Sequence, residues 1–145
     1  MIARIRWPRT FGSLAEAEFG EYRWTFKRWG FLRPRVTVRT DSAAEYSAVL
    51  ELSFGGGGLL RMRSGRCFRW TRQGFWSRQF VFADDQGAEL VFIEPKLGVL
   101  RRSGTVHVHV KATPLPELPL LLLLGWYVTI LIADDEASAV AICCS

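Results

Sequence analysis

Apolar and polar residues alternate along most of the chain between residues 14 and 111. RVTVRT at residues 35–40 sets Val36 and Val38 against arginine and threonine, and TVHVHVK at residues 105–111 repeats the alternation with three valines. A period of two is typical of strands that bury one face. Clusters of glycine, serine and aspartate separate these segments, as the turns between antiparallel strands require. The predicted strands span residues 14–19, 21–27, 35–40, 45–54, 59–63, 66–71, 75–83, 88–94, 98–102 and 105–111.

A second pattern occupies the end of the chain, where LPLLLLLGWYVTILIADD spans residues 118–135. None of the 16 residues from Leu118 to Ala133 is charged. The preceding TPLPELP contains three prolines, which a central strand does not tolerate, so it marks the change from sheet to helix. We therefore expect a helix over residues 117–134 and a tail over residues 136–145. Because this helix is apolar all round, it has to be enclosed on every side.

The enclosing partner in a chain of 145 residues is a sheet wrapped around the helix. The sequence therefore predicts a single all-β domain over residues 1–145. We expect a closed or nearly closed antiparallel β-barrel of about 10–12 short strands around a hydrophobic C-terminal α-helix. Gly125 would let one strand approach the helix closely. The inward strand residues Leu50, Leu52, Val106 and Val108 are expected to pack on Leu122, Trp126 and Ile130.

The same apolar segment leaves a second interpretation open. Sixteen residues make a helix of about 24 Å, whereas a bilayer core of about 30 Å usually takes about 20 apolar residues. No lysine or arginine flanks the segment closely, and the acidic residues Glu117 and Asp134 stand at its two ends. The alternative is a tail-anchored integral membrane protein with a basic cytoplasmic β domain.

Many short antiparallel strands followed by one apolar C-terminal helix resemble the tubby C-terminal-like superfamily, which includes tubby proteins, phospholipid scramblases and LURP-one-related proteins. RQFVFADDQGAELVFI at residues 78–93 is similar to hairpins of the LURP-one-related branch, and residues 118–135 look like the central helix. The resemblance implies a barrel around the helix, with phosphoinositide or phospholipid binding as an expectation. No site residue of the family corresponds to a particular position of this chain.

Charge is concentrated in the strand region. All 19 Lys and Arg residues lie in residues 1–111, and 16 of them are Arg, whereas residues 112–145 hold four acidic residues and no base. Arginine forms forked hydrogen bonds with phosphate and carboxylate groups. The net charge of +5 therefore favours anionic partners, although a solvated basic face without a ligand is the simpler explanation.

Five arginines between residues 61 and 72 form the candidate site. On LLRMR and RCFRWT, Arg61, Arg63 and Arg69 alternate with apolar residues, so they point outward if those residues point inward. Arg66 falls near the turn of this hairpin, and Arg72 lies in the neighbouring segment. We expect the set to bind anionic phospholipid or phosphoinositide head groups at a membrane surface. Cross-strand pairing of these arginines with acidic residues is the competing explanation.

The remaining motifs favour a non-enzymatic binding module. His107 and His109 share a strand face without a third metal ligand, GGGG at 55–58 lacks the Gly-Lys-Ser/Thr of a phosphate loop, and no G-x-S-x-G element occurs. We therefore expect no catalytic residue, cofactor or metal. Nucleic acid is disfavoured, because most aromatic residues alternate with charges and should be buried. Three cysteines without CxxC spacing and the lack of a signal-peptide pattern predict a cytoplasmic protein, peripheral to the membrane if it binds lipid.

Overall fold

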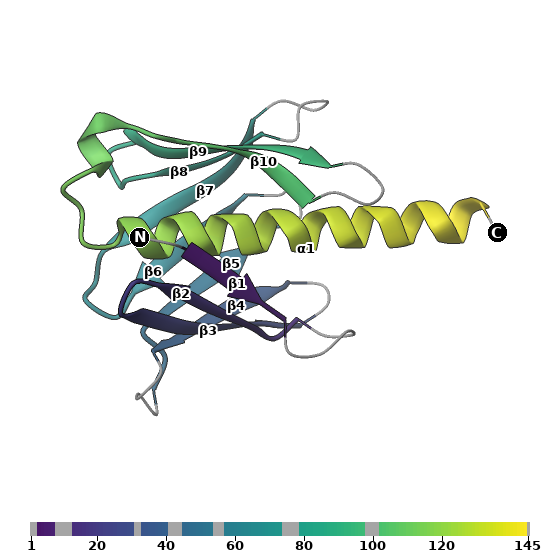
Figure 1. Cartoon of the computed structure of the whole chain (residues 1–145), viewed down its shortest axis with the longest axis horizontal. Helices are drawn as coiled ribbons and strands as arrows, with labels where there is room; N and C mark the ends of the chain where they lie inside the picture. The colour runs from purple at the N-terminus through teal and green to yellow at the C-terminus, as the bar shows by residue number, and fades with distance from the viewer. Residues whose placement is uncertain are drawn as a thin grey trace.

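The structure, a computed structural model, describes residues 3–7, 13–30, 33–40, 45–53, 57–73, 79–97 and 102–144, without the side chains of residues 96–97, 102–104 and 133–144. In these residues ten strands form one antiparallel sheet in chain order (Figure 1). The strands are β1 (Ala3–Arg6), β2 (Ala15–Phe19), β3 (Tyr22–Trp29), β4 (Arg35–Thr40), β5 (Ala48–Leu52), β6 (Gly58–Met62), β7 (Cys67–Gln73), β8 (Gln79–Ala83), β9 (Glu89–Leu97) and β10 (Arg102–Val108). The short 3-10 helix η1 (Val110–Ala112) connects β10 to the helix α1 (Leu118–Cys144).

Tight turns allow each strand to pair with its neighbour in the chain. Gly65 between β6 and β7 has a φ of 96°, and Gly87 between β8 and β9 has a φ of 83°. Glycine takes these left-handed angles without steric strain, so both hairpins stay short. The register between β8 and β9 shifts at Phe82 and Ala83, which is a β-bulge or a similar irregularity. Such shifts increase the local twist of a sheet and help it to curl.

The inner face of the curled sheet packs on the first part of α1 (Figure 1). Phe26 of β3, Leu50 of β5 and Trp70 of β7 have no exposed surface, because the alternation of each strand turns them toward the helix. Trp70 stacks on Phe80 with ring centroids 5.0 Å apart. Buried residues occupy most sides of the helix between Leu120 and Leu131. The predicted contact between the apolar helix and the sheet is therefore confirmed for this part of α1, which packs against several strands.

α1 is longer than the expected helix over residues 117–134. It continues to Cys144, and Figure 1 shows its second half extending beyond the sheet. Among the described side chains, those of α1 that join or pack against the core end at Ile132. Over the residues searched, which are the described ones, no helix combines the length and the apolar character needed to span a bilayer.

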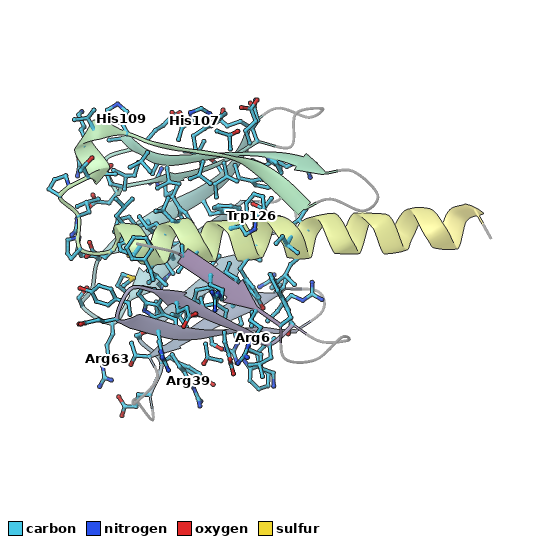
Figure 2. The ribbon with its side chains drawn as sticks, in the orientation of Figure 1. Arg6, Arg39, Arg63, His107, His109 and Trp126 are labelled. Carbon is cyan, nitrogen blue, oxygen red and sulfur yellow. The ribbon has the colours of Figure 1, made fainter. Side chains whose placement is uncertain are left out.

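The sheet is not closed into a barrel, so this part of the predicted fold is wrong. In the described residues β1 pairs with β2 alone and β10 with β9 alone, which leaves a seam between the two edge strands. Trp126 lies on α1 beside this seam (Figure 2), and its side chain is only partly buried. Alternation predicts which residues face the core, but strand twist and shear decide whether the edges of a sheet meet.

Other differences from the predicted strands also concern the sheet edges. Val106 and Val108, expected to pack on the helix, are 37 % and 42 % exposed because they lie on the edge strand β10. β1 was not predicted, since four residues are too few to establish a period. The predicted strand over residues 98–102 lies outside the described residues except for Arg102, which begins β10. Leu50 and Leu52 do face the core, the first fully buried and the second partly buried.

Candidate anion-binding surface

Two adjacent rows of registered residues cross the outer face of the sheet, the face that points away from α1. The first row runs across β3 to β7 through Trp29, Arg35, Glu51, Leu59 and Arg69. The second row, two residues along each strand, runs through Lys27, Thr37, Val49, Arg61 and Cys67. Together the rows hold four bases and one acid. We call Lys27, Trp29, Arg35, Arg61 and Arg69 the outer patch.

The three arginines of the outer patch are exposed and form no ion pair with a described residue. Arg35, Arg61 and Arg69 lie on β4, β6 and β7, and their acidic neighbour in the rows is Glu51. Arg61 lies opposite Cys67 and Arg69 lies opposite Leu59, so the two arginines are diagonal neighbours on adjacent strands. Diagonal neighbours are about 7–8 Å apart, a separation that two long arginine side chains bridge to contact one anion together. An arginine without a carboxylate partner keeps its guanidinium hydrogen bonds for a ligand.

Trp29 borders these arginines, and two contacts fix the position of its side chain. The Nε1 atom of Trp29 donates a hydrogen bond of 2.9 Å to the hydroxyl of Thr37, and the ammonium of Lys27 lies 4.0 Å from the centre of the Trp29 ring. Trp29 remains 41 % exposed although it is fixed at two points. Tryptophan with a basic neighbour is typical of side chains that lie at the level of lipid head groups.

An open hollow adjoins the outer patch at the ends of β4, β5 and β6. Its volume is about 920 Å³, and two arginines stand in its wall beside apolar residues. Gly58 belongs to this wall, and a Cβ there would lie 2.6 Å from the backbone oxygen of Glu51. A side chain at residue 58 would therefore push the strands apart. The lining residues are Arg33, Pro34, Arg35, Glu51, Leu52, Ser53, Gly58 and Leu59.

The structure separates the five arginines that the sequence grouped together. Arg61 and Arg69 point outward, as expected from the inward positions of Leu60 and Trp70. Arg63 is also on the outer face, but it forms an ion pair with Glu45, which precedes β5 in the chain. Only Arg61 and Arg69 therefore stay together as exposed bases without a described acidic partner.

Arg66 and Arg72 are directed away from this pair. Arg66 donates two hydrogen bonds, of 3.0 and 3.1 Å, to the carboxylate of Glu117 just before α1, so it joins the β6–β7 turn to the helix. Arg72 is half-buried and shares the inner side of β7 with Trp70, with its guanidinium 5.8 Å from the Phe80 ring centre. The ion pair between Arg66 and Glu117 was not predicted, because these two residues are far apart in the chain.

A second group of arginines, on the outer face of β1 to β3, was also missed. Arg6 contacts Glu16 at 2.5 Å, Arg4 contacts Glu18 at 3.5 Å, and Arg23 lies 4.0 Å from Glu18. The hydrogen bond with the Glu16 carboxylate raises the pKa of the Arg6 guanidinium above its usual value. Alternating glutamates in AEAEF were the signal in the sequence for such cross-strand pairs. These bases are matched by acids, unlike the arginines of the outer patch.

The histidines lie at the other edge of the molecule, His107 on β10 and His109 just after it, at the start of η1 (Figure 2). His107 packs on Phe92 with ring centroids 5.6 Å apart, and its Nε2 atom is 3.7 Å from Glu94. His109 accepts a hydrogen bond from the backbone of Lys111 through Nδ1. Within the described residues, no group of three metal-ligating side chains comes together.

Comparison of the chain with protein-family models, with curated proteins and with solved structures found no match. The architecture established here is a ten-strand antiparallel sheet, in the described residues, with a C-terminal helix packed against its inner face.

Proposed function

We propose that this protein is a non-enzymatic module that binds anionic phospholipid or phosphoinositide head groups through the outer patch. The observation that carries the proposal is the pair of adjacent rows on β3 to β7, which hold four bases and one acid. The proposed location is the cytoplasmic face of a membrane, where anionic lipids attract basic surfaces. Binding would be peripheral, with the sheet lying against the head groups.

The energetics of the outer patch suit a reversible membrane contact. Each base near an anionic surface contributes about 1 kcal/mol, so three exposed arginines contribute about 3 kcal/mol, or about a hundredfold in affinity. Trp29 adds an aromatic side chain at the level of the head groups. The hollow beside Arg35 offers space for a phosphate group between two arginines.

The resemblance to the tubby-like superfamily belongs to this proposal. A curled antiparallel sheet around a C-terminal apolar helix supports the resemblance. The open seam between β1 and β10 departs from the closed barrel that the resemblance implies. The proposed lipid binding therefore depends on the outer patch and would stand without the kinship.

Co-sedimentation with vesicles tests the proposal. We expect the full chain to bind vesicles of phosphatidylcholine with phosphatidylserine or a phosphoinositide, and not vesicles of phosphatidylcholine alone. Arg61→Glu with Arg69→Glu replaces two attractions by two repulsions, so the bound fraction should fall at least about tenfold at about 0.1 M salt.

A matched variant separates local binding from net charge. Arg23→Glu with Lys111→Glu changes the net charge equally but lies outside the outer patch, so we expect it to retain most of the binding. Equal losses in the two double variants would show attraction without a site and contradict the proposal. Unchanged binding after reversal of Arg61 and Arg69 would contradict it directly.

A further inference from the structure

Among the described residues β10 is an edge strand, so its inner side chains have a neighbouring strand on one side only. Val106 and Val108 pair with Ile93 and Val91 of β9, so all four side chains belong to the inner face. Ile93 and Val91 are at most 1 % exposed, whereas Val106 and Val108 are 37 % and 42 % exposed. The contrast between directly paired residues arises because, in the part of the chain that the structure describes, β9 has a strand on both sides and β10 has one on one side only.

The exposed valines stand beside a stripe of α1 that the sheet leaves partly uncovered. Leu118, Leu122 and Trp126 follow each other at intervals of four residues, which places them on one side of the helix. All three are partly buried, whereas Leu121 and Leu124 between them have no exposed surface. In Figure 2, Trp126 lies between β10 and β1. The seam therefore leaves five apolar residues partly uncovered, and we call them the apolar seam: Val106, Val108, Leu118, Leu122 and Trp126.

The two edges of the sheet differ in their protection against further pairing. β1 has four residues, and its charged residues Arg4 and Arg6 are the kind that normally block pairing at an edge. β10 has seven residues and a single arginine, Arg102, at its start. Its stretch from Thr105 to Val108 contains β-branched residues and histidine but no charged residue or proline. β10 therefore presents the unprotected edge.

Unpaired backbone N–H and C=O groups along such an edge accept an extended chain as an additional strand. The apolar seam next to β10 favours apolar side chains at alternate positions of that chain, because alternate residues of a strand share one face. Basic residues stand at both ends of the edge, because β10 begins at Arg102 and Lys111 follows it. Acidic residues at the two ends of the added chain would complement these bases.

We propose that β10 binds an extended peptide segment of a partner protein as an eleventh strand of the sheet. The segment carries apolar residues at alternate positions, which cover Val106, Val108 and Trp126, and acidic residues at its ends. Backbone hydrogen bonds to β10 supply affinity, and contact with the apolar seam selects the side chains. This site is separate from the outer patch and does not depend on lipid binding.

A second copy of the chain fits this edge less well. Antiparallel pairing of β10 with the β10 strand of another copy brings Arg102 of each chain toward the Lys111 end of the other. Like charges placed opposite each other across strands are destabilising. The β1 edge of another copy adds arginines to the same surface. Charge therefore favours an acidic partner segment over self-association.

Fluorescence anisotropy with a synthetic peptide tests the proposal on the full chain. The probe is a labelled peptide of about seven residues, Asp-Val-Thr-Val-Thr-Val-Asp, with blocked termini. We expect saturable binding, which Val106→Thr with Val108→Thr should weaken at least about tenfold, because threonine keeps the shape of valine but adds a hydroxyl to the apolar seam. Val110→Thr is the matched control. Val110 is also exposed but lies in η1 beyond the strand, so binding should persist.

Backbone methylation distinguishes strand pairing from unspecific hydrophobic contact. In an antiparallel pair, alternate N–H groups of the added strand point toward its neighbour. Two peptides methylated at one or the other alternate set of nitrogens should therefore differ, with one binding and the other not. Equal behaviour of both peptides, or no binding to the wild-type chain, would overturn the proposal.

Two further outcomes would also overturn it by showing a different occupant. One is a concentration-dependent dimer, seen by light scattering, that Val106→Thr with Val108→Thr converts to monomer. The other is loss of vesicle binding in the same double variant without any peptide binding by the wild-type chain. If the peptide binds and Arg61→Glu with Arg69→Glu leaves its affinity unchanged, the β10 edge and the outer patch are independent.

Discussion

Gly125 lies where α1 meets the sheet at close range. A Cβ at this position would overlap Cδ1 of Ile93 and would lie 3.3 Å from ring atoms of both Trp70 and Phe82. Glycine lowers helix stability by about 1 kcal/mol relative to alanine, so its presence in the middle of α1 has a packing cause. The expectation that Gly125 permits close approach of a strand is therefore confirmed.

We expect Gly125→Ala to lower the free energy of unfolding by about 1–2 kcal/mol, because the overlap outweighs the gain in helix propensity. Ile93→Val removes Cδ1, the atom that the new methyl group overlaps. The double variant should therefore lose less stability than the sum of the two single variants. Denaturant unfolding of all four proteins measures this coupling, and strict additivity would contradict the contact.

Tyr127 joins the helix to the strands near the start of the chain. Its ring lies 5.3 Å from that of Phe26 and 6.1 Å from that of Trp7, and its hydroxyl donates a hydrogen bond to the backbone oxygen of Ser13. Burial raises the pKa of the Tyr127 hydroxyl above its ordinary value. The folded protein therefore holds this proton more tightly than the unfolded chain.

Tyr127→Phe should lower the free energy of unfolding by about 1 kcal/mol at pH 7, because the Ser13 oxygen loses its partner. Above about pH 10 the unfolded wild-type chain loses the tyrosine proton before the folded protein does. The wild-type free energy of unfolding should then fall with pH more steeply than that of the variant. Urea unfolding at pH 7 and pH 11 checks this, and a constant difference between the two proteins would contradict it.

The β6–β7 hairpin shows how far alternation predicts a strand pair. The inward positions of Leu60, Phe68 and Trp70 and the outward positions of Arg61 and Arg69 follow from period two alone. Alternation does not indicate which exposed charges find partners. Arg66 meets Glu117 only because the chain returns from β10 through η1 to the same end of the sheet. The hairpin was therefore predictable, whereas its link to the helix was not.

Glu117→Gln should lower the free energy of unfolding by about 0.5–1 kcal/mol, since it removes the charge that accepts two hydrogen bonds from Arg66. The loss should shrink at about 1 M salt, where partly exposed ion pairs are screened. Glu45→Gln is the matched control. It interrupts the ion pair with Arg63, in which both side chains are largely exposed, so its effect should be near zero. Equal effects at both positions would contradict the proposed link to the helix.

The edges of the sheet were the least predictable elements. Val106 and Val108 alternate as regularly as Val36 and Val38, yet only the valines of β4 are fully buried. The alternation of apolar and polar residues indicates that a strand has one apolar face. It does not indicate whether a further strand pairs with that strand. The expected packing of β10 on the helix failed for this reason.

At the scale of the whole molecule, charge is distributed in two different ways over one outer face. On β1 to β3 the arginines meet glutamates on neighbouring strands, so that region is largely neutralised. On β4 to β7 the arginines of the outer patch have no described acidic partner. Part of the net charge of +5 therefore lies on one defined surface, a position that the composition alone does not indicate. The proposed lipid contact rests on this difference.

Three features were readable from the chain before any coordinates: short strands, turns rich in glycine, and an apolar helix that strands must cover. These features depend on contacts between residues close in sequence and on the cost of leaving apolar side chains in water. Three other features depend on where distant strands lie in space: the open seam, the ion pair between Arg66 and Glu117, and the outer patch. Curvature and register decide those positions, so the residues on either side of the seam and across the outer face became neighbours only in the folded molecule.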